Sequence, residues 1–327
     1  MISGCGIREK ESTAEAEADS FKEVATNLHI PWSINQIGDE FYISERVGTI
    51  AYVKEGIVEH QKVELSPPLA NVSEAGLLGF VLKPTFEETQ NAFAYYNYDD
   101  GQGTFNRIVT LKLENNVWKE TEIHLDALST GNVHHGGRLE IGPDDLLYAT
   151  IGDAANPQLS QNPTALNGKI IRLNSDHKWE TVSLGHRNPQ GLAWNDEGEL
   201  YASEHGQSAM DEINKIGEGN NYGWPLIEGN EKLEGYVTPL LHSGEDTTWA
   251  PSGMTFHKGR LYVAALRGEG ILVVNVETAK LEETITGFGR VRDVFSNGEE
   301  LYFVSNNKDG RGSPKRDDDI LYQYLDE

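Results

Sequence analysis

Asp144-Asp145-Leu146-Leu147-Tyr148 is one of six short segments in which a turn of small or polar residues leads into a strand that ends in an aromatic residue. The tyrosines that end the first four segments are 53 residues apart, and the next two intervals are 61 and 40 residues. A repeat of about 40–50 residues that contains only short strands is typical of a β-propeller with one repeat per blade. We therefore predict an all-β fold, a six-bladed β-propeller of four-stranded antiparallel blades. The other five segments are Gly38–Tyr42, Gln90–Tyr95, Glu197–Tyr201, Lys258–Tyr262 and Gly298–Tyr302.

The composition excludes several classes of partner. The 327 residues carry a formal net charge of −25, and a surface of this sign repels nucleic acid and anionic lipid. No run of 18 apolar residues is present, so the sequence contains no candidate membrane span. We expect a monomer that binds a small molecule and no nucleic acid.

The first 24 residues differ from the rest of the chain. Cys5 follows small residues in Ser3-Gly4, as in the cleavage box of a bacterial lipoprotein, and it is the single cysteine. The segment that follows is rich in Glu, Ala, Ser and Lys and has few large apolar residues. We expect residues 1–24 to be a lipoprotein-like N-terminus and a disordered acidic linker, and residues 25–327 to be the propeller. Lipid on Cys5 would hold the protein on the outer, extracytoplasmic side of a bacterial cell membrane; the alternative is a chance cysteine in a loose terminus.

Hairpin symmetry places a histidine beside a carboxylate. Residues equidistant from the turn of an antiparallel hairpin lie opposite each other. His134 and Asp153 are each about ten residues from the turn at Pro143-Asp144, so we expect them to meet at the open end of the hairpin. A carboxylate in this position fixes the tautomer of the imidazole.

The open ends of all six hairpins should gather on one face of the propeller. The same counting sets Arg187 opposite Gly206 and Trp32 level with Glu45. It also brings arginines from several blades to this face of a strongly acidic chain. Because the planar guanidinium binds carboxylate oxygens in pairs, we predict a pocket for a small, flat, multiply anionic ligand. The residues expected there are His134, Asp153, Arg187, Asn188, Gln190, Arg267, Arg290, Arg292, Trp32, Trp249 and, at the entry of the second hairpin, Glu74.

Each of these residues also has a purely structural interpretation. His134 and Asp153 could form a pair that closes a blade, and Arg187 could anchor a loop. The arginines near position 291 could form salt bridges with acids such as Asp293. Trp32 and Trp249 could belong to the core.

Nine motifs in this order resemble the glucose/sorbosone dehydrogenase family, the soluble quinoprotein sugar dehydrogenases. The resemblance extends from about Asn27 to the C-terminus and implies a six-bladed propeller that uses pyrroloquinoline quinone (PQQ) and Ca²⁺. It also implies oxidation of aldose sugars at C1 to lactones, with electrons passed to an external acceptor. The motifs are Gly76–Gly79, His134-x-x-Gly137-Arg138-Leu139, Thr150–Asp153, Leu166–Lys169, Gly185–Gly191, Asp211–Asn214, Asn221–Pro225, Ala250–Gly253 and Arg290–Asp293.

The resemblance implies roles for individual residues. His134 would be the general base, Asp153 its orienting partner and Arg187 the group that polarises the quinone oxygens. Gly206 and Gln207 would hold the PQQ-bound Ca²⁺ through backbone carbonyls, while Glu212 and Tyr222 would belong to a second Ca²⁺ site. The residues expected to bind PQQ are Glu74, Arg187, Asn188, Gln190, Trp249, Arg267, Arg290 and Arg292.

Three of these positions depart from the family pattern. Glu74 stands where many members have Gln, which could make its hydrogen bond to PQQ weaker or dependent on pH. Arg267 replaces a Lys, and Gln207 replaces a Pro. Two other functions stay open: a Ca²⁺-dependent lactonase on a propeller, and a sugar-binding propeller without catalysis.

Overall fold

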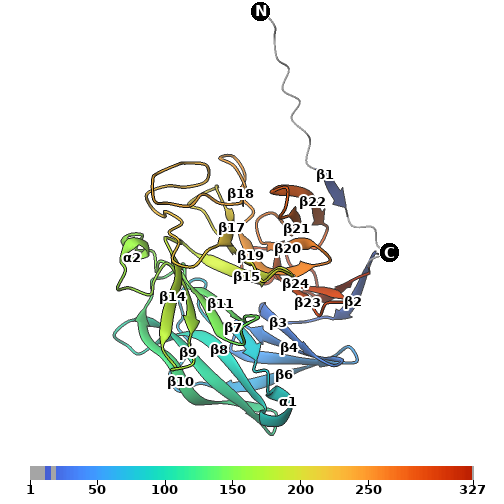
Figure 1. Cartoon of the computed structure of the whole chain (residues 1–327). Helices are drawn as coiled ribbons and strands as arrows, with labels where there is room; N and C mark the ends of the chain where they lie inside the picture. The colour runs from blue at the N-terminus through green and yellow to red at the C-terminus, as the bar shows by residue number, and fades with distance from the viewer. Residues whose placement is uncertain (1–11, 16–19, 326–327) are drawn as a thin grey trace, which may run out of the picture.

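A computed structural model describes residues 12–15 and 20–325, which form short strands arranged in five sheets. Cys5 lies outside the described residues, so its lipidation stays a prediction. The sheets are arranged around a common centre (Figure 1). The first described strand is β1 (Ser12–Glu15). The expected all-β fold with four-stranded antiparallel sheets is confirmed.

Two of the sheets have four strands that follow one another in chain order. Each is antiparallel throughout, as expected for strands joined by tight turns. The strands are β11 (Gly136–Ile141), β12 (Leu147–Ile151), β13 (Lys169–Leu173) and β14 (Trp179–Leu184) in one sheet, and β15 (Pro189–Trp194), β16 (Leu200–Glu204), β17 (Glu212–Ile216) and β18 (Leu241–His242) in the other.

One sheet has eight strands and contains two antiparallel runs of four. The runs join edge to edge through β6 and β10, which pair in parallel from Lys62 opposite Val117 to Glu64 opposite Lys119. The first run is β3 (Pro31–Ile37), β4 (Glu40–Glu45), β5 (Thr49–Lys54) and β6 (Ile57–Glu64); the second is β7 (Leu77–Leu82), β8 (Asn91–Asp99), β9 (Thr104–Glu114) and β10 (Val117–Ser129).

The two remaining sheets both include strands from the N-terminal region. In one, β1 pairs in parallel with the edge strand β22. In the other, β2 (Phe21–Ala25) pairs with β25, so an early and a late strand complete the same sheet. The domain boundary that we predicted between residues 24 and 25 falls inside β2. Residues 1–11 and 16–19 of the predicted linker lie outside the described residues. The other strands are β19 (Pro251–His257), β20 (Arg260–Ala265), β21 (Gly270–Asn275), β22 (Lys280–Thr286), β23 (Val291–Ser296), β24 (Leu301–Ser305) and β25 (Leu321–Tyr324).

The first strands of the four-stranded runs line the centre of the molecule. Strands β3, β7, β11, β15, β19 and β23 contact one another in this order, and β23 contacts β3, so they close into a ring. Buried apolar residues fill the spaces between neighbouring runs; Trp118, Tyr95 and Phe303 are among the largest fully buried side chains. This packing fixes the open ends of the hairpins relative to one another.

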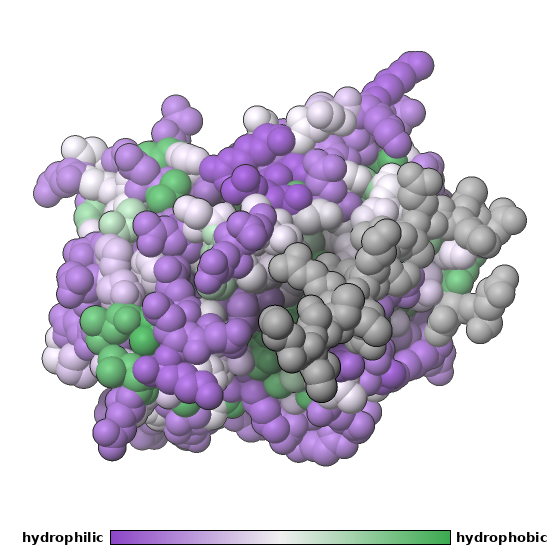
Figure 2. Space-filling view, turned by 90° about the horizontal axis from the view of Figure 1, so that it is seen from above, coloured by the Kyte–Doolittle hydropathy of each residue, from purple (hydrophilic) through white to green (hydrophobic). Residues whose placement is uncertain are grey.

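The described residues include only two short helices, α1 (Phe86–Thr89) and α2 (Gln158–Gln161). No helix among residues 12–15 and 20–325 is long and apolar enough to cross a membrane. Seen from above, the molecule presents a mostly hydrophilic surface with small, separate hydrophobic areas (Figure 2).

Candidate active site

His134 and Asp153 meet at the open end of the β11–β12 hairpin, as predicted. His134 Nδ1 lies 2.7 Å from Asp153 Oδ1. A carboxylate only accepts hydrogen bonds, so Nδ1 carries the proton and Nε2 is left as the basic nitrogen. Asp153 is fully buried, whereas the side chain of His134 is 17% exposed. The pair therefore combines a fixed tautomer with access for a small molecule.

The backbone at this end is packed too tightly for side chains. A Cβ on Gly152 would lie 2.0 Å from the His134 carbonyl oxygen. His134 itself adopts a left-handed backbone conformation with φ 63°. Such conformations in non-glycine residues are uncommon and occur often at functional sites.

Trp224 contacts the His134–Asp153 pair, and Arg187 lies next to Trp224. Trp224 Nε1 donates to Asp153 Oδ2 over 2.9 Å, and the Arg187 guanidinium lies 5.4 Å from the Trp224 ring centroid. The Arg187 carbonyl accepts from the Asp153 amide over 2.8 Å. A cation therefore lies close to the histidine and its carboxylate.

A small cavity of about 20 Å³ lies beside this group. Asn188 and Gln190 are buried beside it. Asn188 Oδ1 accepts a hydrogen bond from the Gly136 amide, and Gln190 Oε1 accepts one from Arg292 Nη1. The lining residues are Trp32, Arg46, Glu74, Leu78, His135, Gly136, Gln190, His205, Leu266, Arg292, Asp309 and Arg311.

Three buried nitrogen atoms in this region lack a hydrogen-bond partner among the described residues: His205 Nε2 and Arg292 Nε at the cavity, and Arg187 Nε next to it. Burial lowers the pKa of Arg292 to about 9, with repulsion from Arg46 as the next cause, so Arg292 is still a cation at neutral pH. Buried donors without acceptors are costly and are rare in native proteins. The residues present therefore fit a ligand that brings several acceptor oxygens, such as an aromatic carboxylate.

Three of the predicted cofactor-binding residues have other surroundings. Arg290 donates through Nε and Nη2 to Asp309 Oδ2 and through Nη1 to the Leu266 carbonyl. Trp249 is only 6% exposed and packs in a hydrophobic cluster, as its structural interpretation foresaw. Arg267 is exposed. None of the three lines the cavity within the described part of the chain, and their roles toward a cofactor stay predictions.

Glu74 lies at the cavity as a fixed carboxylate. Its Oε1 accepts from Arg311 Nη2 over 2.9 Å, and its Oε2 accepts from the His134 amide over 3.3 Å. Burial opposes ionisation, but His205, Arg311 and the His134 amide together lower the pKa of Glu74 to about 2. Since burial lowers the pKa of His205 to about 4, Arg311 is the cation that acts at neutral pH. In this structure Glu74 therefore titrates well below neutral pH, and its effect on a hydrogen bond to PQQ stays a prediction.

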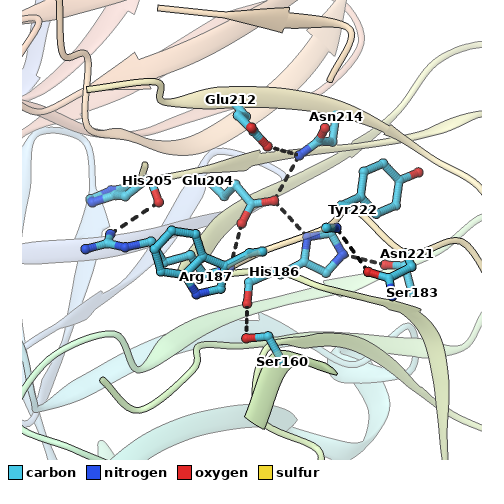
Figure 3. Close-up of polar contacts among 12 residues, drawn as sticks. Ser160, Ser183, His186, Arg187, Glu204, His205, Glu212, Asn214, Asn221 and Tyr222 are labelled. Carbon is cyan, nitrogen blue, oxygen red and sulfur yellow. Dashed lines mark hydrogen bonds and ion pairs between the residues drawn. The ribbon is translucent and has the colours of Figure 1, made fainter. Parts of the chain in front are cut away.

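A second buried polar network lies behind Arg187 (Figure 3). His186 bridges Ser183 Oγ and Glu204 Oε1, each over 2.7 Å, and Glu204 Oε2 accepts from the Arg187 amide. Asn214 Nδ2 donates to both Glu204 and Glu212. Burial and repulsion by Glu204 raise the pKa of Glu212 to about 8. Two buried carboxylates that share one donor fit a site for a hard cation.

The backbone near these carboxylates also offers oxygen ligands. No hydrogen bond in the described part of the chain ends on the carbonyls of Gly206, Gln207 or Tyr222. The Tyr222 phenol is already used, because it donates to the Lys215 carbonyl over 2.5 Å. Gly206, Gln207 and Tyr222 thus offer free backbone carbonyls, whereas the two carboxylate oxygens of Glu212 accept from the Gly229 amide and Asn214 Nδ2.

The sequence did not predict several residues that build this region. Most come from loops whose reach cannot be counted from a hairpin turn; Arg46 and His205 are the exceptions, because they directly follow β4 and β16 at the open ends of their hairpins. These residues are Arg46, His205, Trp224, Asp309 and Arg311.

Comparisons with known proteins agree with this geometry. A quinoprotein glucose dehydrogenase B from Acinetobacter calcoaceticus is 31% identical over 270 residues, which cover 68% of this chain and 56% of that protein. An aldose sugar dehydrogenase from Escherichia coli K12 is 28% identical, covering 86% and 89% of the two chains. The structure of a PQQ-bound aldose sugar dehydrogenase from Streptomyces coelicolor superposes with a TM-score of 0.85 at 32% identity, covering 93% and 97%.

A gluconolactonase from Xanthomonas campestris shares the fold alone, with 14% identity and a TM-score of 0.53. The family model of glucose/sorbosone dehydrogenases, in contrast, matches residues 28–316. This match spans most of the chain, and the relatives with substantial identity are named as oxidoreductases that act on sugars. The chain belongs to the glucose/sorbosone dehydrogenase family.

Proposed function

We propose that this protein is a PQQ- and Ca²⁺-dependent aldose dehydrogenase that oxidises cyclic aldoses at C1 to lactones. The observation that carries the proposal is the His134–Asp153 pair beside a cavity in which Arg46 and Arg292 form no ion pair with a described residue. The related Streptomyces coelicolor structure is PQQ-bound, and PQQ offers acceptor oxygens to such donors.

We also infer that the propeller has six blades. The two antiparallel runs of the eight-stranded sheet count as separate blades, and β2 completes the last one. The parallel contact between β6 and β10 is then a contact between the outer edges of neighbouring blades.

Several buried residues would hold PQQ. Arg187 and Arg292 have unused guanidinium donors, and the side-chain NH₂ groups of Asn188 and Gln190 donate to no described residue. These donors suit carboxylate and quinone oxygens. When bound, PQQ supplies an acceptor for the hydride that leaves C1 of the sugar.

The chain's own residues would move the proton. His134 Nε2, which accepts no hydrogen bond from the described residues, would take the proton of the C1 hydroxyl as a general base. Asp153 stabilises the resulting imidazolium and keeps the reactive nitrogen in place, and Trp224 holds Asp153. The Arg187 cation lies where it would stabilise negative charge that develops nearby.

Calcium would occupy two places. The carbonyls of Gly206 and Gln207 would bind the ion that contacts the cofactor, next to Arg187 and His205. Glu212 and the Tyr222 carbonyl would bind a structural ion, with the buried Glu204 adding negative charge.

The test is reconstitution. Purified protein is mixed with PQQ and Ca²⁺, and reduction of a dye is followed with a panel of aldoses; EDTA-treated protein and His134→Ala are the controls. We expect turnover that needs both additions and that falls about 100-fold or more in His134→Ala, the low end for loss of a general base. Lactone hydrolysis without PQQ would instead support the lactonase, and saccharide binding without dye reduction would support the non-catalytic propeller.

The cellular setting follows from the N-terminus. We propose that lipid on Cys5 holds the enzyme outside the cell membrane, where it passes electrons to an external acceptor. Expression of the natural gene followed by mass spectrometry of the N-terminal peptide tests this. An unmodified Cys5 in membrane-free protein would contradict it.

A further inference from the structure

Arg46 is a guanidinium at the cavity without an anionic partner. It follows β4 directly, and its backbone is fixed on both sides: its amide donates to the Ile30 carbonyl over 3.0 Å, and its carbonyl accepts from the Leu77 amide over 3.2 Å. Its side chain makes no hydrogen bond or ion pair with any residue that the structure describes. The backbone of Arg46 is therefore fixed, whereas its guanidinium makes no hydrogen bond with a described residue.

Arg46 lines the same cavity as Arg292. Burial lowers the pKa of Arg46, the Asp309 and Glu74 carboxylates act in the opposite direction, and the Arg311 and Arg290 cations lower it further. Repulsion from Arg46 in turn lowers the pKa of Arg292. Two partly desolvated cations that repel each other across a cavity would both gain from an anion between them.

The carboxylates of the cavity are not free to serve as that anion. Asp309 Oδ2 accepts two hydrogen bonds from Arg290, and its Oδ1 accepts from the Arg311 amide. Glu74 is bound to Arg311 and to the His134 amide. An anion for Arg46 must therefore come from outside the chain.

A glycine keeps room for the Arg46 side chain. Gly76 has φ 147°, and a Cβ at this position would lie 2.2 Å from the Arg46 carbonyl oxygen and 2.4 Å from its Cγ. Any other residue at position 76 would push the stem of Arg46 away from its place.

We propose that Arg46, together with Arg292, forms the pair that binds a carboxylate of the cofactor. Arg290 resembles a carboxylate-binding residue in sequence, but its donors are already used within the chain, whereas those of Arg46 are free. The planar guanidinium can bind both oxygens of one carboxylate. This inference rests on the proposed function, because it concerns the same site.

The test measures binding rather than turnover. Equilibrium dialysis gives the Kd of PQQ with Ca²⁺ for the wild type, Arg46→Gln and Arg46→Lys, with Arg260→Gln as a matched control. Arg260 is an arginine of β20 whose partner is Glu282, remote from the cavity. We expect a Kd about 10- to 100-fold higher in Arg46→Gln, as for loss of charge-assisted hydrogen bonds. Arg46→Lys should lie in between, and Arg260→Gln should match the wild type.

A second probe keeps this test separate from the proposed function. Benzene-1,3,5-tricarboxylate is added to the cofactor-free protein, and the shift of the thermal midpoint is measured. We expect stabilisation of the wild type and of Arg260→Gln, and little shift in Arg46→Gln. Because Arg46 has no partner in the chain, the midpoint of Arg46→Gln without ligand should equal that of the wild type; if this variant fails to fold, Arg46→Lys carries the comparison.

The outcomes separate the two proposals. Wild-type-like binding of both probes by Arg46→Gln would overturn the role of Arg46 and leave the dehydrogenase intact. If the wild type binds the tricarboxylate but not PQQ, the proposed function fails, and the loss of tricarboxylate binding in Arg46→Gln still supports the anion site. If the wild type binds neither, both proposals are overturned.

Discussion

Asp153 holds two ring systems at once: its Oδ1 accepts from the His134 imidazole over 2.7 Å, and its Oδ2 accepts from the Trp224 indole over 2.9 Å. Oδ1 also accepts from the Ala155 amide over 2.8 Å. A fully buried carboxylate with both oxygens occupied cannot turn, and so the orientation of His134 is fixed before any sugar arrives.

Asp153→Asn should lower turnover by about 100-fold or more, as expected when a general base is lost. The amide NH₂ of Asn would donate to Nδ1 and favour the tautomer that carries its proton on Nε2, the wrong one for a base. The Kd of PQQ should stay within about 3-fold of the wild-type value, since Asp153 does not line the cavity. Steady-state kinetics beside PQQ dialysis check this; unchanged turnover would remove Asp153 from the mechanism.

Glu74→Gln should leave the shape of the pH–rate profile unchanged between pH 4 and 9. The pKa of Glu74 is lowered to about 2, so the wild-type residue is already a carboxylate over this whole range. A change in rate near neutral pH that the wild type shows and Glu74→Gln does not would contradict this. The unfolding free energy should change by less than about 1 kcal/mol, because the lost partner Arg311 is half exposed.

The sequence predicted those site residues whose positions follow from strand pairing within a hairpin. Counting from the turn put His134 opposite Asp153, and the observed pair of Gly136 with Ile151 has the same register. The prediction of Arg187 opposite Gly206 agrees with the observed pair of Pro189 with Glu204. Strand pairing is a local rule, so the order of the residues suffices.

Counting was less accurate where a bulge shifts the register. Trp32 was placed level with Glu45, but Pro31 is the residue that pairs with it. Asp309 was not predicted at all, because it lies in the long connection from β24 to β25. Its contact with Arg290 depends on how this connection folds back, and no turn fixes that from the sequence. Of the predicted arginines, Arg292 lines the cavity, whereas Arg290 is bound to Asp309, a carboxylate that the sequence did not reveal.

Asp309→Ala should lower the unfolding free energy by about 3–5 kcal/mol, since it leaves a buried guanidinium without its carboxylate. The side chains of Arg290 and Asp309 are only 6% and 2% exposed. The double variant Arg290→Met/Asp309→Leu should recover most of the loss. Denaturant titration checks both variants, with Lys62→Ala in the exposed Lys62–Glu64 pair as a control that should not change the midpoint. A double variant as unstable as Asp309→Ala would contradict the ion-pair argument.

Asp319→Asn should stabilise the protein at pH 8 and much less at pH 4.5. Burial raises the pKa of Asp319 to about 7 from 3.8, even though the Asn307 and Lys308 amides act in the opposite direction, and its Oδ2 is buried without a partner. Between these two values the folded state binds more protons than the unfolded state, so this group makes stability fall as the pH rises.

At pH 8 the full penalty for the buried charge is present, and removing it should add about 1–3 kcal/mol, the cost of an unsatisfied buried polar group. Urea unfolding of wild type and variant at both pH values measures the difference. An equal effect at both pH values would show that Asp319 does not titrate between them.

EDTA should lower the thermal midpoint of the wild type, and added Ca²⁺ should restore it. An ion bound at 100 times its Kd stabilises by about 2.7 kcal/mol. Glu212→Gln removes a buried carboxylate of the proposed site and should abolish the response, whereas Glu197→Gln, at an exposed turn, should keep it. Calorimetry with and without EDTA gives the answer; an equal response in Glu212→Gln would place the ion elsewhere.

The pairing of β2 with β25 sets an order for biosynthesis. β2 leaves the ribosome early, whereas its partner β25 is the last strand among the described residues. Earlier sheets can form while translation continues, but this sheet can be completed only after β25 has emerged. Until then β2 lacks its partner strand, so a truncation that removes β25 would leave the sheet incomplete.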